Sequence, residues 1–412
     1  MNIWLINHYA VPPSLYPLAR TTYFAKHLMK AGHSVTVFAA SMVHNSEINL
    51  INDKSPYHEE TVEGVHYVYV RTCFYKGNGI RRIINMFQFA KRLPKVCRLF
   101  ENPDAILAST ATPPACMAGI NLSKKYRCRG IAEVSDLWPE SFVAYGLIRK
   151  QNPLLFLMYQ YEKKIYEKAD AIIFTMEGGI DYIIKKGWDK STKLIDLKKV
   201  FHINNGVDIE EYEYNRSRYV ISDPDLNSEY TFKVVYTGSI REANSLGTIV
   251  DAVEILHNRA ENHIRFFIYG DGCDRESLSD KCLQKGLNNI VFKGSVDKKY
   301  IPSILSKSDL NLFHVNETPI LKFGVSPNKL FEYFAAGKPI LSDVKAGYDL
   351  IEKYKAGIVL GSQLPQIIAD SILEFAQMPA EIYGEYSANA KNAALDYDFK
   401  TLTLKLLSIL KE

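Results

Sequence analysis

Residues 233–272 have the sequence KVVYTGSIREANSLGTIVDAVEILHNRAENHIRFFIYGDG, and this stretch decides the fold class. An apolar run at 233–237 predicts a buried strand, helical periodicity follows over 245–257, and 264–269 predicts a second buried strand. A strand, a helix and a further strand in this order are typical of a parallel sheet with crossover helices. The stretch therefore predicts an α/β protein.

The same alternation continues in both directions along the chain. Before the quoted stretch we predict strands at 3–6, 35–39, 64–71, 105–109, 130–134 and 169–175, with 64–71 half-exposed, and helices at 20–31 and ending near 168. After it we predict a helix at 274–285, a strand at 290–293, a helix at 299–307 and a strand at 309–313.

Residues 210–230 are charged and tyrosine-rich, and their lack of a clear period predicts a linker. We therefore predict two doubly wound, Rossmann-like domains at 1–205 and 206–394, with a C-terminal helix at 395–412 that crosses back to the first. Ligands in such sheets bind outside the carboxyl ends of the strands, so we expect the active site in the cleft between the domains.

The composition excludes several classes of protein. The 412 residues suffice for two or three domains, and 47% hydrophobic with 23% charged residues is ordinary for a globular chain. Lysine and arginine (50) nearly balance aspartate and glutamate (46), which argues against a nucleic-acid partner. The six cysteines lack the spacing of a zinc or redox pair, and no apolar run reaches the roughly 18 residues of a bilayer span. We expect a cytoplasmic protein, or one peripheral on the inner membrane face.

The segment from Ser326 to Pro339 predicts an anion site. Ser326 is a plausible N-cap and Pro327 suits the first helical position, so a helix should begin there. The N–H groups at its start, with Lys329 one turn in, would attract an anion. Glu332 lies near the same end and could accept hydrogen bonds from a sugar diol. A capping carboxylate without a ligand is the alternative.

Two loops that follow predicted strands are further candidates. Arg241, after Gly238, could clamp a phosphate bidentately, or it could be a solvated loop arginine. Gly270-Asp-Gly272 could let a ligand approach the backbone closely, but a plain tight turn is the simpler interpretation. The segment is not a dinucleotide fingerprint, because Arg275 stands where the third glycine of that pattern would be.

The first half of the chain holds two more features. Asp136 and Glu140 follow a predicted strand and could tune each other for acid or base chemistry, with structural caps as the alternative. Residues 76–100 carry seven basic side chains and no acidic one, interleaved with Ile and Phe. Such a segment could lie on an anionic membrane, or its apolar side could pack on its own domain.

Two aspartate pairs, Asp223 with Asp225 and Asp396 with Asp398, imitate a metal-binding motif. Neither pair follows a buried strand, so we expect no metal there.

Taken in order, these segments resemble a family 4 retaining glycosyltransferase of the GT-B fold, over nearly the whole chain. The motifs are Ala31-Gly-His-Ser-Val-Thr-Val37, Asp136-Leu-Trp-Pro139, Asn204-Asn-Gly-Val-Asp208, Gly238 with Arg241, Gly270-Asp-Gly272, and Lys329 to Pro339. The forms around Asp136 and Lys329 look most like bacterial transferases that build O-antigen and capsule repeats.

The resemblance implies a nucleotide-sugar donor held by the second domain and an acceptor bound by the first. Glu332 corresponds to the second glutamate of the family's Glu-x7-Glu motif, which holds the ribose. Arg241 and Lys329 correspond to the basic pair on the diphosphate, and the backbone at Gly270 to Gly272 to the region near the base.

The sequence departs from the family at three places. Gly324 replaces the first glutamate of the motif, so N–H groups around Ser326 to Asn328 would take over its role. Ser135 replaces a common histidine, which leaves Asp136 as the leading catalytic candidate. The loop after the first strand, Asn7 to Pro13, lacks the usual glycine pair.

We therefore expect metal-independent transfer of a sugar from a UDP-sugar to a lipid-linked or oligosaccharide acceptor, with retention at the anomeric carbon and without a cofactor. Asp136, Arg241 and Lys329 would be catalytic. The alternatives are a GT-B UDP-sugar epimerase and a non-catalytic nucleotide-sugar-binding subunit of a polysaccharide assembly complex.

Overall fold

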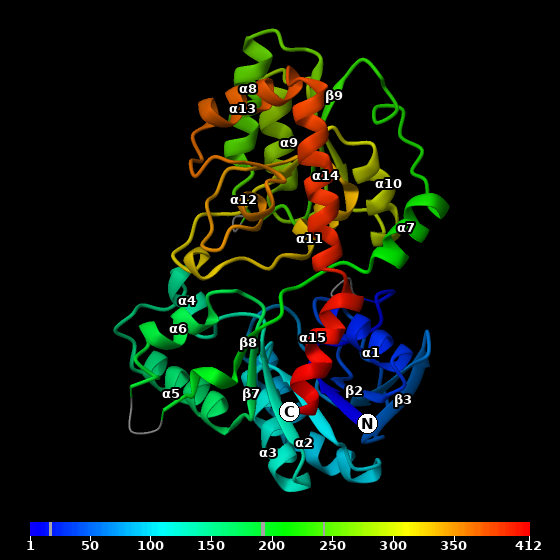
Figure 1. Cartoon of the computed structure of the whole chain (residues 1–412), viewed down its shortest axis with the longest axis vertical. Coiled ribbons are helices and arrows are strands. Elements are labelled where there is room, and N and C mark those ends of the chain that lie inside the picture. The colour runs from blue at the N-terminus through cyan, green and yellow to red at the C-terminus, as the bar shows by residue number, and fades with distance from the viewer. Residues whose placement is uncertain (16–18, 191–193, 242–243) are drawn as a thin grey trace. The chain divides into compact units, whose positions relative to one another are not determined.

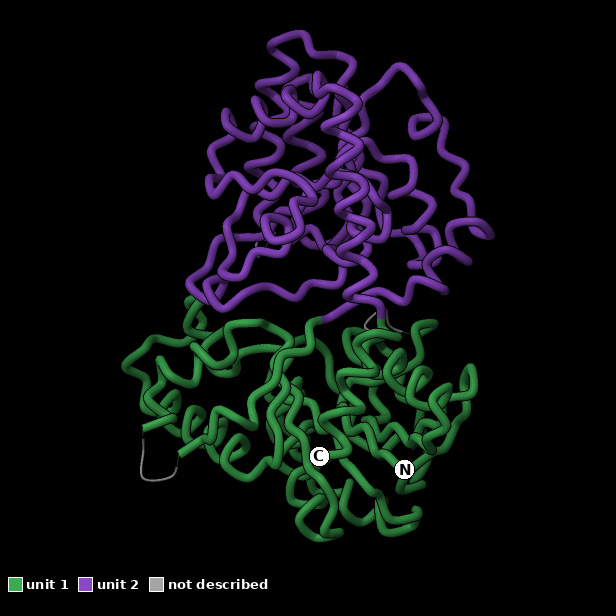
Figure 2. The backbone as a smooth tube through the Cα atoms, viewed as in Figure 1, with its two compact units in different colours: residues 1–204, 399–412 green, residues 205–398 purple. Residues whose placement is uncertain are grey.

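The computed structural model describes residues 1–15, 19–190, 194–241 and 244–412. The chain forms two compact units (Figure 2), and each contains a β-sheet with helices packed on it. Unit 1 comprises Met1–Asn204 and Phe399–Glu412, and unit 2 comprises Asn205–Asp398. The predicted fold class, two Rossmann-like domains with parallel sheets, is confirmed.

Within the described residues, unit 1 contains an eight-stranded sheet in the order β3-β4-β2-β1-β5-β6-β7-β8. Its strands are parallel except β3, which pairs antiparallel with β4. The prediction of a half-exposed strand at 64–71 was wrong, because β4 lies between β2 and β3 and is almost wholly buried. The strands are β1 (Asn2–Ile6), β2 (Ser34–Ala40), β3 (Tyr57–Val62), β4 (Val65–Val70), β5 (Ala105–Ser109), β6 (Arg129–Val134), β7 (Ala171–Phe174) and β8 (Val200–His202).

Helices cover both faces of this sheet (Figure 1). On one side, α2 packs on α3 and α3 packs on α5. On the other, the C-terminal helix packs on α1, and the rings of Tyr23 and Phe399 stack with centroids 4.8 Å apart. The helices are α1 (Arg20–Lys30), α2 (Ile80–Val96), α3 (Pro113–Tyr126), α4 (Glu140–Ala144), α5 (Pro153–Lys168), α6 (Gly179–Lys185) and α15 (Phe399–Lys411).

Unit 2 is built on a parallel sheet whose described strands follow the order β11-β10-β9-β12-β13-β14. The first strand, β9, is flanked by β10 and β12, so the strand order reverses between β9 and β12 and the loops after these two strands diverge. Such a switch point is where doubly wound sheets bind ligands. The strands are β9 (Phe232–Thr237), β10 (Ile264–Tyr269), β11 (Ile290–Gly294), β12 (Leu310–Phe313), β13 (Ile340–Ser342) and β14 (Gly357–Val359).

The core of unit 2 lies between this sheet and α8 with α13. Ile249, Val253 and Leu256 of α8 are fully buried against strand residues such as Phe266. Burying each of these side chains stabilises the unit by about 1.5–3 kcal/mol. The helices are α7 (Ile209–Arg218), α8 (Gly247–Asn258), α9 (Arg275–Gln284), α10 (Ile301–Ser306), α11 (Asn328–Ala336), α12 (Leu350–Tyr354), α13 (Pro365–Ala376) and α14 (Ala380–Asp396).

The predicted linker at 210–230 was wrong in its first half, which forms α7. Asp208 caps this helix by accepting a hydrogen bond from Glu211 N at 2.9 Å, and Tyr212 is buried. The weak periodicity concealed the helix because its inward face is narrow. Nearby, the segments that enter and leave unit 2 meet, since Val207 N donates to Tyr397 O at 3.0 Å.

Candidate functional site

The loops after β9, β10 and β11 are joined by backbone hydrogen bonds at the carboxyl edge of the unit 2 sheet. Gly238 N donates to Tyr269 O at 2.9 Å, and Gly270 N donates to Gly294 O at 2.8 Å. Ile240 N donates to the carbonyl of Asp271 at 3.0 Å. The candidate residues Gly238, Gly270 and Gly272 are therefore brought together in one framework.

Glycine is required here because the backbones touch. A Cβ on Gly270 would lie 1.7 Å from Gly238 O, and one on Gly272 would lie 2.1 Å from Ile240 O. Gly238 and Gly270 also have φ values of 149° and 143°, which other residues rarely adopt. This geometry supports the tight-turn interpretation of Gly270-Asp-Gly272, because a neighbouring loop fills the space beside each glycine.

Arg241 extends from this framework into solvent. Its side chain is exposed, while its carbonyl accepts hydrogen bonds from Asn244 N at 2.7 Å and Ser245 N at 3.2 Å. The Asn244 amide also donates to Ser239 O at 2.6 Å. These bonds hold the backbone carbonyl of Arg241 and leave its guanidinium accessible to an anionic ligand.

The start of α11 differs from the prediction. The helix begins at Asn328 with an extended Pro327 before it, so Ser326 is not the N-cap. Instead, Asn205 N donates to Ser326 Oγ and the Asn205 amide donates to Ser326 O, both at 2.9 Å. The helix ends before Gly337, whose φ of 63° closes it as predicted.

Lys329 projects from the first turn of α11 into a pocket of protein groups. Its Nζ donates to His314 O at 2.9 Å and lies 4.3 Å from the ring centroid of Tyr236. Burial lowers the pKa of Lys329 to about 7. The amine therefore lies beside β9 and the loop after β12. With this pKa, it gains or loses a proton near neutral pH.

A buried histidine and aspartate, which the sequence analysis missed, join the two diverging loops. His314 follows β12 and Asp343 follows β13, and both side chains are fully buried. Nδ1 of His314 lies 2.5 Å from Asp343 Oδ2, and Nε2 lies 3.1 Å from Ser245 O. A carbonyl can only accept, so Nε2 donates to Ser245 O, and His314 thereby joins Ser245 to the loops after β12 and β13.

Gln363 completes this network. Its amide donates to Val315 O at 2.9 Å and approaches Asp343 Oδ2 at 3.3 Å. The signal that could have found the network is positional, since His314 and Asp343 each follow directly after an apolar strand.

Glu332 lies one turn beyond Lys329 on α11, and its side chain is 15% exposed. It forms an ion pair with Lys298 at 3.3 Å, a partner that the sequence did not suggest. The next residue, Tyr333, fixes the helix against the sheet because its hydroxyl accepts from Thr237 N at 2.9 Å. The carboxylate is thus held at the carboxyl edge while remaining accessible.

In unit 1, the two candidate carboxylates have different surroundings. Asp136 lies in the loop after β6 and is exposed, yet desolvation by nearby protein raises the pKa of its carboxyl. Glu140 accepts hydrogen bonds from Tyr159 and Lys186, both at 2.5 Å. Although burial opposes them, these partners lower the pKa of Glu140. The structure therefore supports a structural role for Glu140 and leaves Asp136 as the accessible carboxylate.

Glu133, at the end of β6, belongs to a structural contact. It pairs with Arg20 at 2.8 Å, and Arg20 also donates to Asn204 O at 2.6 Å and Ile203 O at 2.9 Å. The loop after β1 is likewise held by its own aromatic contacts. Tyr9 stacks on His44 with centroids 4.4 Å apart and accepts from Arg82 at 2.9 Å.

The aspartates at 223 and 225 act as ion-pair partners. Lys293 Nζ lies 2.9 Å from Asp223 and 2.7 Å from Asp225, and Arg265 approaches Asp225 at 3.0 Å. Within the described residues, no group of His, Cys, Asp and Glu is arranged to hold a metal ion.

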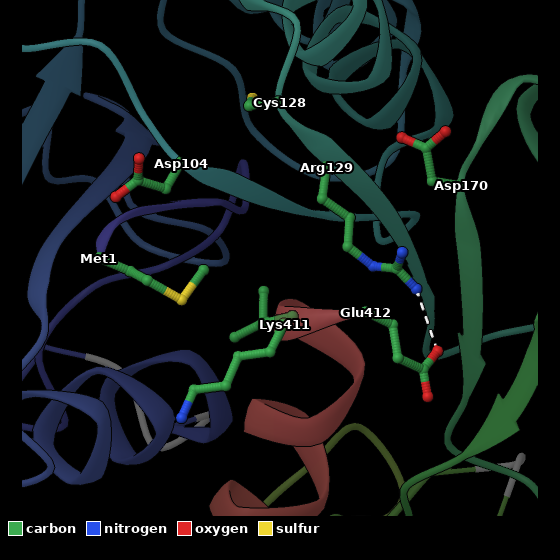
Figure 3. A pocket seen from close by; sticks show the side chains of 8 residues that line it. Met1, Asp104, Cys128, Arg129, Asp170, Lys411 and Glu412 are labelled. Carbon is green, nitrogen blue, oxygen red and sulfur yellow. Dashed lines mark hydrogen bonds and ion pairs between the residues drawn. The ribbon is translucent and has the colours of Figure 1, made fainter.

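A pocket of about 700 Å³ lies at the opposite, amino edge of the unit 1 sheet (Figure 3). Its carboxylates hold the ends of strands: Asp104 accepts from Asn2 N at 2.7 Å and Asp170 accepts from Gly130 N at 2.8 Å. Doubly wound sheets bind ligands at the carboxyl edge, so this pocket is not the candidate site.

Comparison with known proteins points to one enzyme class. Residues 19–211 match the model of Glycosyltransferase Family 4, and residues 231–378 match that of Glycosyl transferases group 1. Together these matches cover both units.

Two curated bacterial proteins are similar to the chain. One is named as the teichuronic acid biosynthesis glycosyltransferase TuaH of Bacillus subtilis (strain 168), with 25% identity over 51% of this chain and 49% of the relative. The other is named as the glycosyltransferase WbjE of Pseudomonas aeruginosa, with 22% identity over 66% of this chain and 64% of the relative. The chain thus spans about half to two thirds of the length of these relatives.

Among solved structures, Anabaena Alr3699/HepE in complex with UDP has a TM-score of 0.69 at 14% identity, with all of both chains covered. At this identity the likeness shows the shared fold.

Proposed function

Because the chain belongs to the GT-B glycosyltransferases, with a Family 4 first part and a group 1 second part, we propose that it transfers a sugar from a UDP-sugar to a lipid-linked or oligosaccharide acceptor. The reaction would retain the anomeric configuration and serve cell-surface polysaccharide biosynthesis, such as that of O-antigen or capsule. The named activity of TuaH and the UDP bound to HepE support this choice of pathway and donor.

One observation carries the proposal. At the switch point of unit 2, Lys329 and Glu332 lie on successive turns of α11, and the carbonyl that Lys329 contacts belongs to His314 of the β12 loop. Cationic groups and helix N–H groups suit a diphosphate, while a carboxylate suits a ribose diol. A nucleoside diphosphate presents both chemistries in adjacent positions.

The proposed reaction breaks the bond between the anomeric carbon and the β-phosphate oxygen and forms a bond from that carbon to an acceptor oxygen. Negative charge develops on the leaving diphosphate. Arg241, Lys329 and the N–H groups at the start of α11 would stabilise this charge without a metal. Such preorganised groups contribute through electrostatics that strengthen in the transition state.

The acceptor hydroxyl must lose its proton as the new bond forms. We assign Asp136 to position this hydroxyl, with the proton passing to Asp136 or to the leaving phosphate oxygen. The attack would occur on the face that the diphosphate leaves, which preserves the configuration without a carboxylate nucleophile.

Peripheral contact with an anionic membrane is part of the proposal. Among the described helices, none combines the length and apolarity needed to cross a bilayer. On α2, however, Ile80, Ile83, Ile84 and Phe87 are 46–73% exposed, while Met86, Phe89 and Leu93 pack inward. The helix thus has one apolar side for its own domain and a second, exposed apolar stripe beside basic residues.

A thermal-shift screen tests the donor class. A ligand that binds the folded protein at 100 times its Kd stabilises it by about 2.7 kcal/mol. We expect UDP-sugars to raise the melting temperature while GDP-, ADP- and CMP-sugars leave it unchanged. Stabilisation by another nucleotide class alone would refute the UDP assignment.

A further inference from the structure

Three helices of unit 1, α4, α5 and α6, are fastened together by polar contacts. Glu140 of α4 accepts from Tyr159 of α5, and Lys186, just after α6, bonds the same carboxylate and lies 3.7 Å from the Tyr159 ring centroid. The buried carboxylate of Glu162 on α5 accepts hydrogen bonds from Tyr166 of the same helix and from Tyr182 of α6, each at 2.8 Å. The helices therefore form one supported platform.

Four large apolar side chains of this platform are exposed. Leu147, Leu154, Phe156 and Leu157 are 55–70% exposed, although Leu155 between them is buried and anchors α5. The turn that carries Leu147 is itself ordered, since Leu147 N donates to Phe142 O at 2.8 Å. Large side chains held outward on a rigid support are typical of an interaction surface.

The charge of this surface is basic. Residues 141–161 contain Arg149 and Lys150, both exposed, and no aspartate or glutamate. The neighbouring α6 adds exposed Ile184 and Lys185, with Asp181 exposed on its first turn. Exposed apolar groups with basic neighbours match an anionic lipid surface.

The chain topology places this surface on the same face of the sheet as the stripe on α2, with α3 between the two helices. Helices α2, α3 and α5 form one layer on the sheet (Figure 1). Because α2 is the next helix after β4, its first turns lie toward the carboxyl edge, and α5 likewise runs from that edge back to β7. Both exposed surfaces, Ile80 to Phe87 and Leu147 to Leu157, therefore lie toward the edge that carries Asp136.

We propose that residues 145–157 form a second membrane-docking surface, which binds an anionic bilayer together with α2. This inference rests on the proposed function, because it would bring the carboxyl edge of unit 1 to a lipid-linked acceptor. A second copy of the chain is a less suitable occupant, since two like-charged surfaces repel each other.

Co-sedimentation of the full chain with vesicles tests the surface. The vesicles contain either phosphatidylcholine alone or phosphatidylcholine with phosphatidylglycerol. We expect binding to the anionic vesicles that weakens with salt, and about a 10-fold loss in the double variant Phe156→Glu/Leu157→Glu. The matched control is Leu404→Glu, which alters an equally exposed leucine on α15 and should bind like the parent.

Melting temperature and UDP-sugar stabilisation are measured on every variant. Unchanged values with lost vesicle binding support the docking surface. Parent-like vesicle binding by Phe156→Glu/Leu157→Glu overturns it. A parent chain that is dimeric, with a variant that is monomeric, overturns it as well. Failure of the parent to bind vesicles while UDP-sugar stabilises it overturns the docking surface alone, whereas vesicle binding without any UDP-sugar effect overturns the donor assignment alone.

Discussion

His314 and Asp343 form a fully buried pair, 2.5 Å apart, in which the second nitrogen of the imidazole holds Ser245 O at 3.1 Å. Removal of one partner from a buried hydrogen bond costs about 1–3 kcal/mol, because the other polar group stays buried without that partner. We therefore expect Asp343→Leu to lower the urea midpoint of unit 2 strongly. The double variant with His314→Leu should lose much less than the sum of the single variants, and additive losses would contradict the coupling.

Donor binding should depend on pH through Lys329. Burial lowers the pKa of this amine to about 7, so it loses its positive charge as the pH rises through 7. A neutral amine attracts the diphosphate less, and the affinity for UDP-sugar should fall above that pH. In Lys329→Met the affinity should be lower and independent of pH between 6 and 8, as isothermal titration can measure. An unchanged pH profile in this variant would exclude Lys329 as the titrating group.

Loss of Arg241 or alteration of Glu332 should weaken donor binding. A hydrogen bond to a charged group contributes about 1.5–3 kcal/mol, so Arg241→Ala and Glu332→Gln should each raise the Kd for UDP-sugar by roughly 10- to 100-fold. The control is Arg259→Ala, which removes an exposed ion pair with Asp370 at the other end of α8. If both site variants bind and hydrolyse the donor like the parent, the assigned site is wrong.

Asp136→Asn should separate transfer from donor binding. A positioned acid or base contributes about 100- to 10,000-fold to the rate, so transfer to acceptor should fall in this range while donor affinity stays near that of the parent. Glu140→Gln serves as the contrast, because this residue bonds Tyr159 and Lys186 and should lower the melting temperature instead. Equal loss of transfer and donor binding in Asp136→Asn would make Asp136 a structural residue.

Gly270→Ala should destabilise unit 2 severely. The added Cβ would meet Gly238 O at 1.7 Å, and the φ of 143° is strained for any other residue. We expect a loss of several kcal/mol, visible as a lower melting temperature or poor yield. Gly384→Ala is the matched control, since this glycine lies in α14 with nothing near its Cβ position. There, alanine should stabilise the helix by about 1 kcal/mol.

Much of the fold follows from local apolar patterning. Strand 264–269 has the predicted bounds because it is an apolar run, interrupted at Arg265 alone, that ends at Gly270. By contrast, β3 has the sequence YHEETV and an exposed edge position, so it offers no apolar run, and its pairing with β4 is what makes it a strand. Helix α7 was hidden for a similar reason, since Tyr212 is its buried residue.

Among the site residues, short motifs identified the segments but not the contacts. Ser326 was predicted to be a helix cap, whereas its hydroxyl oxygen accepts a hydrogen bond from Asn205 N. The pairing of His314 with Asp343 joins residues 29 positions apart, and a contact at that separation exists only once β12 and β13 lie side by side. The sequence shows the residue pattern within one segment. The hydrogen-bond partners in other segments depend on the order of the strands in the sheet.

The hydrogen bond between Val207 N and Tyr397 O has a consequence for how the protein can be divided. Unit 2 is a continuous insertion, and this hydrogen bond joins the segments at its two ends. Unit 1 is completed by α15, which follows the insertion in the chain. A fragment that stops at 204 would leave the surface under Phe399 uncovered, whereas residues 205–398 form a closed module with adjacent ends. Unit 2 is therefore the portion suited to excision, circular permutation or transplantation.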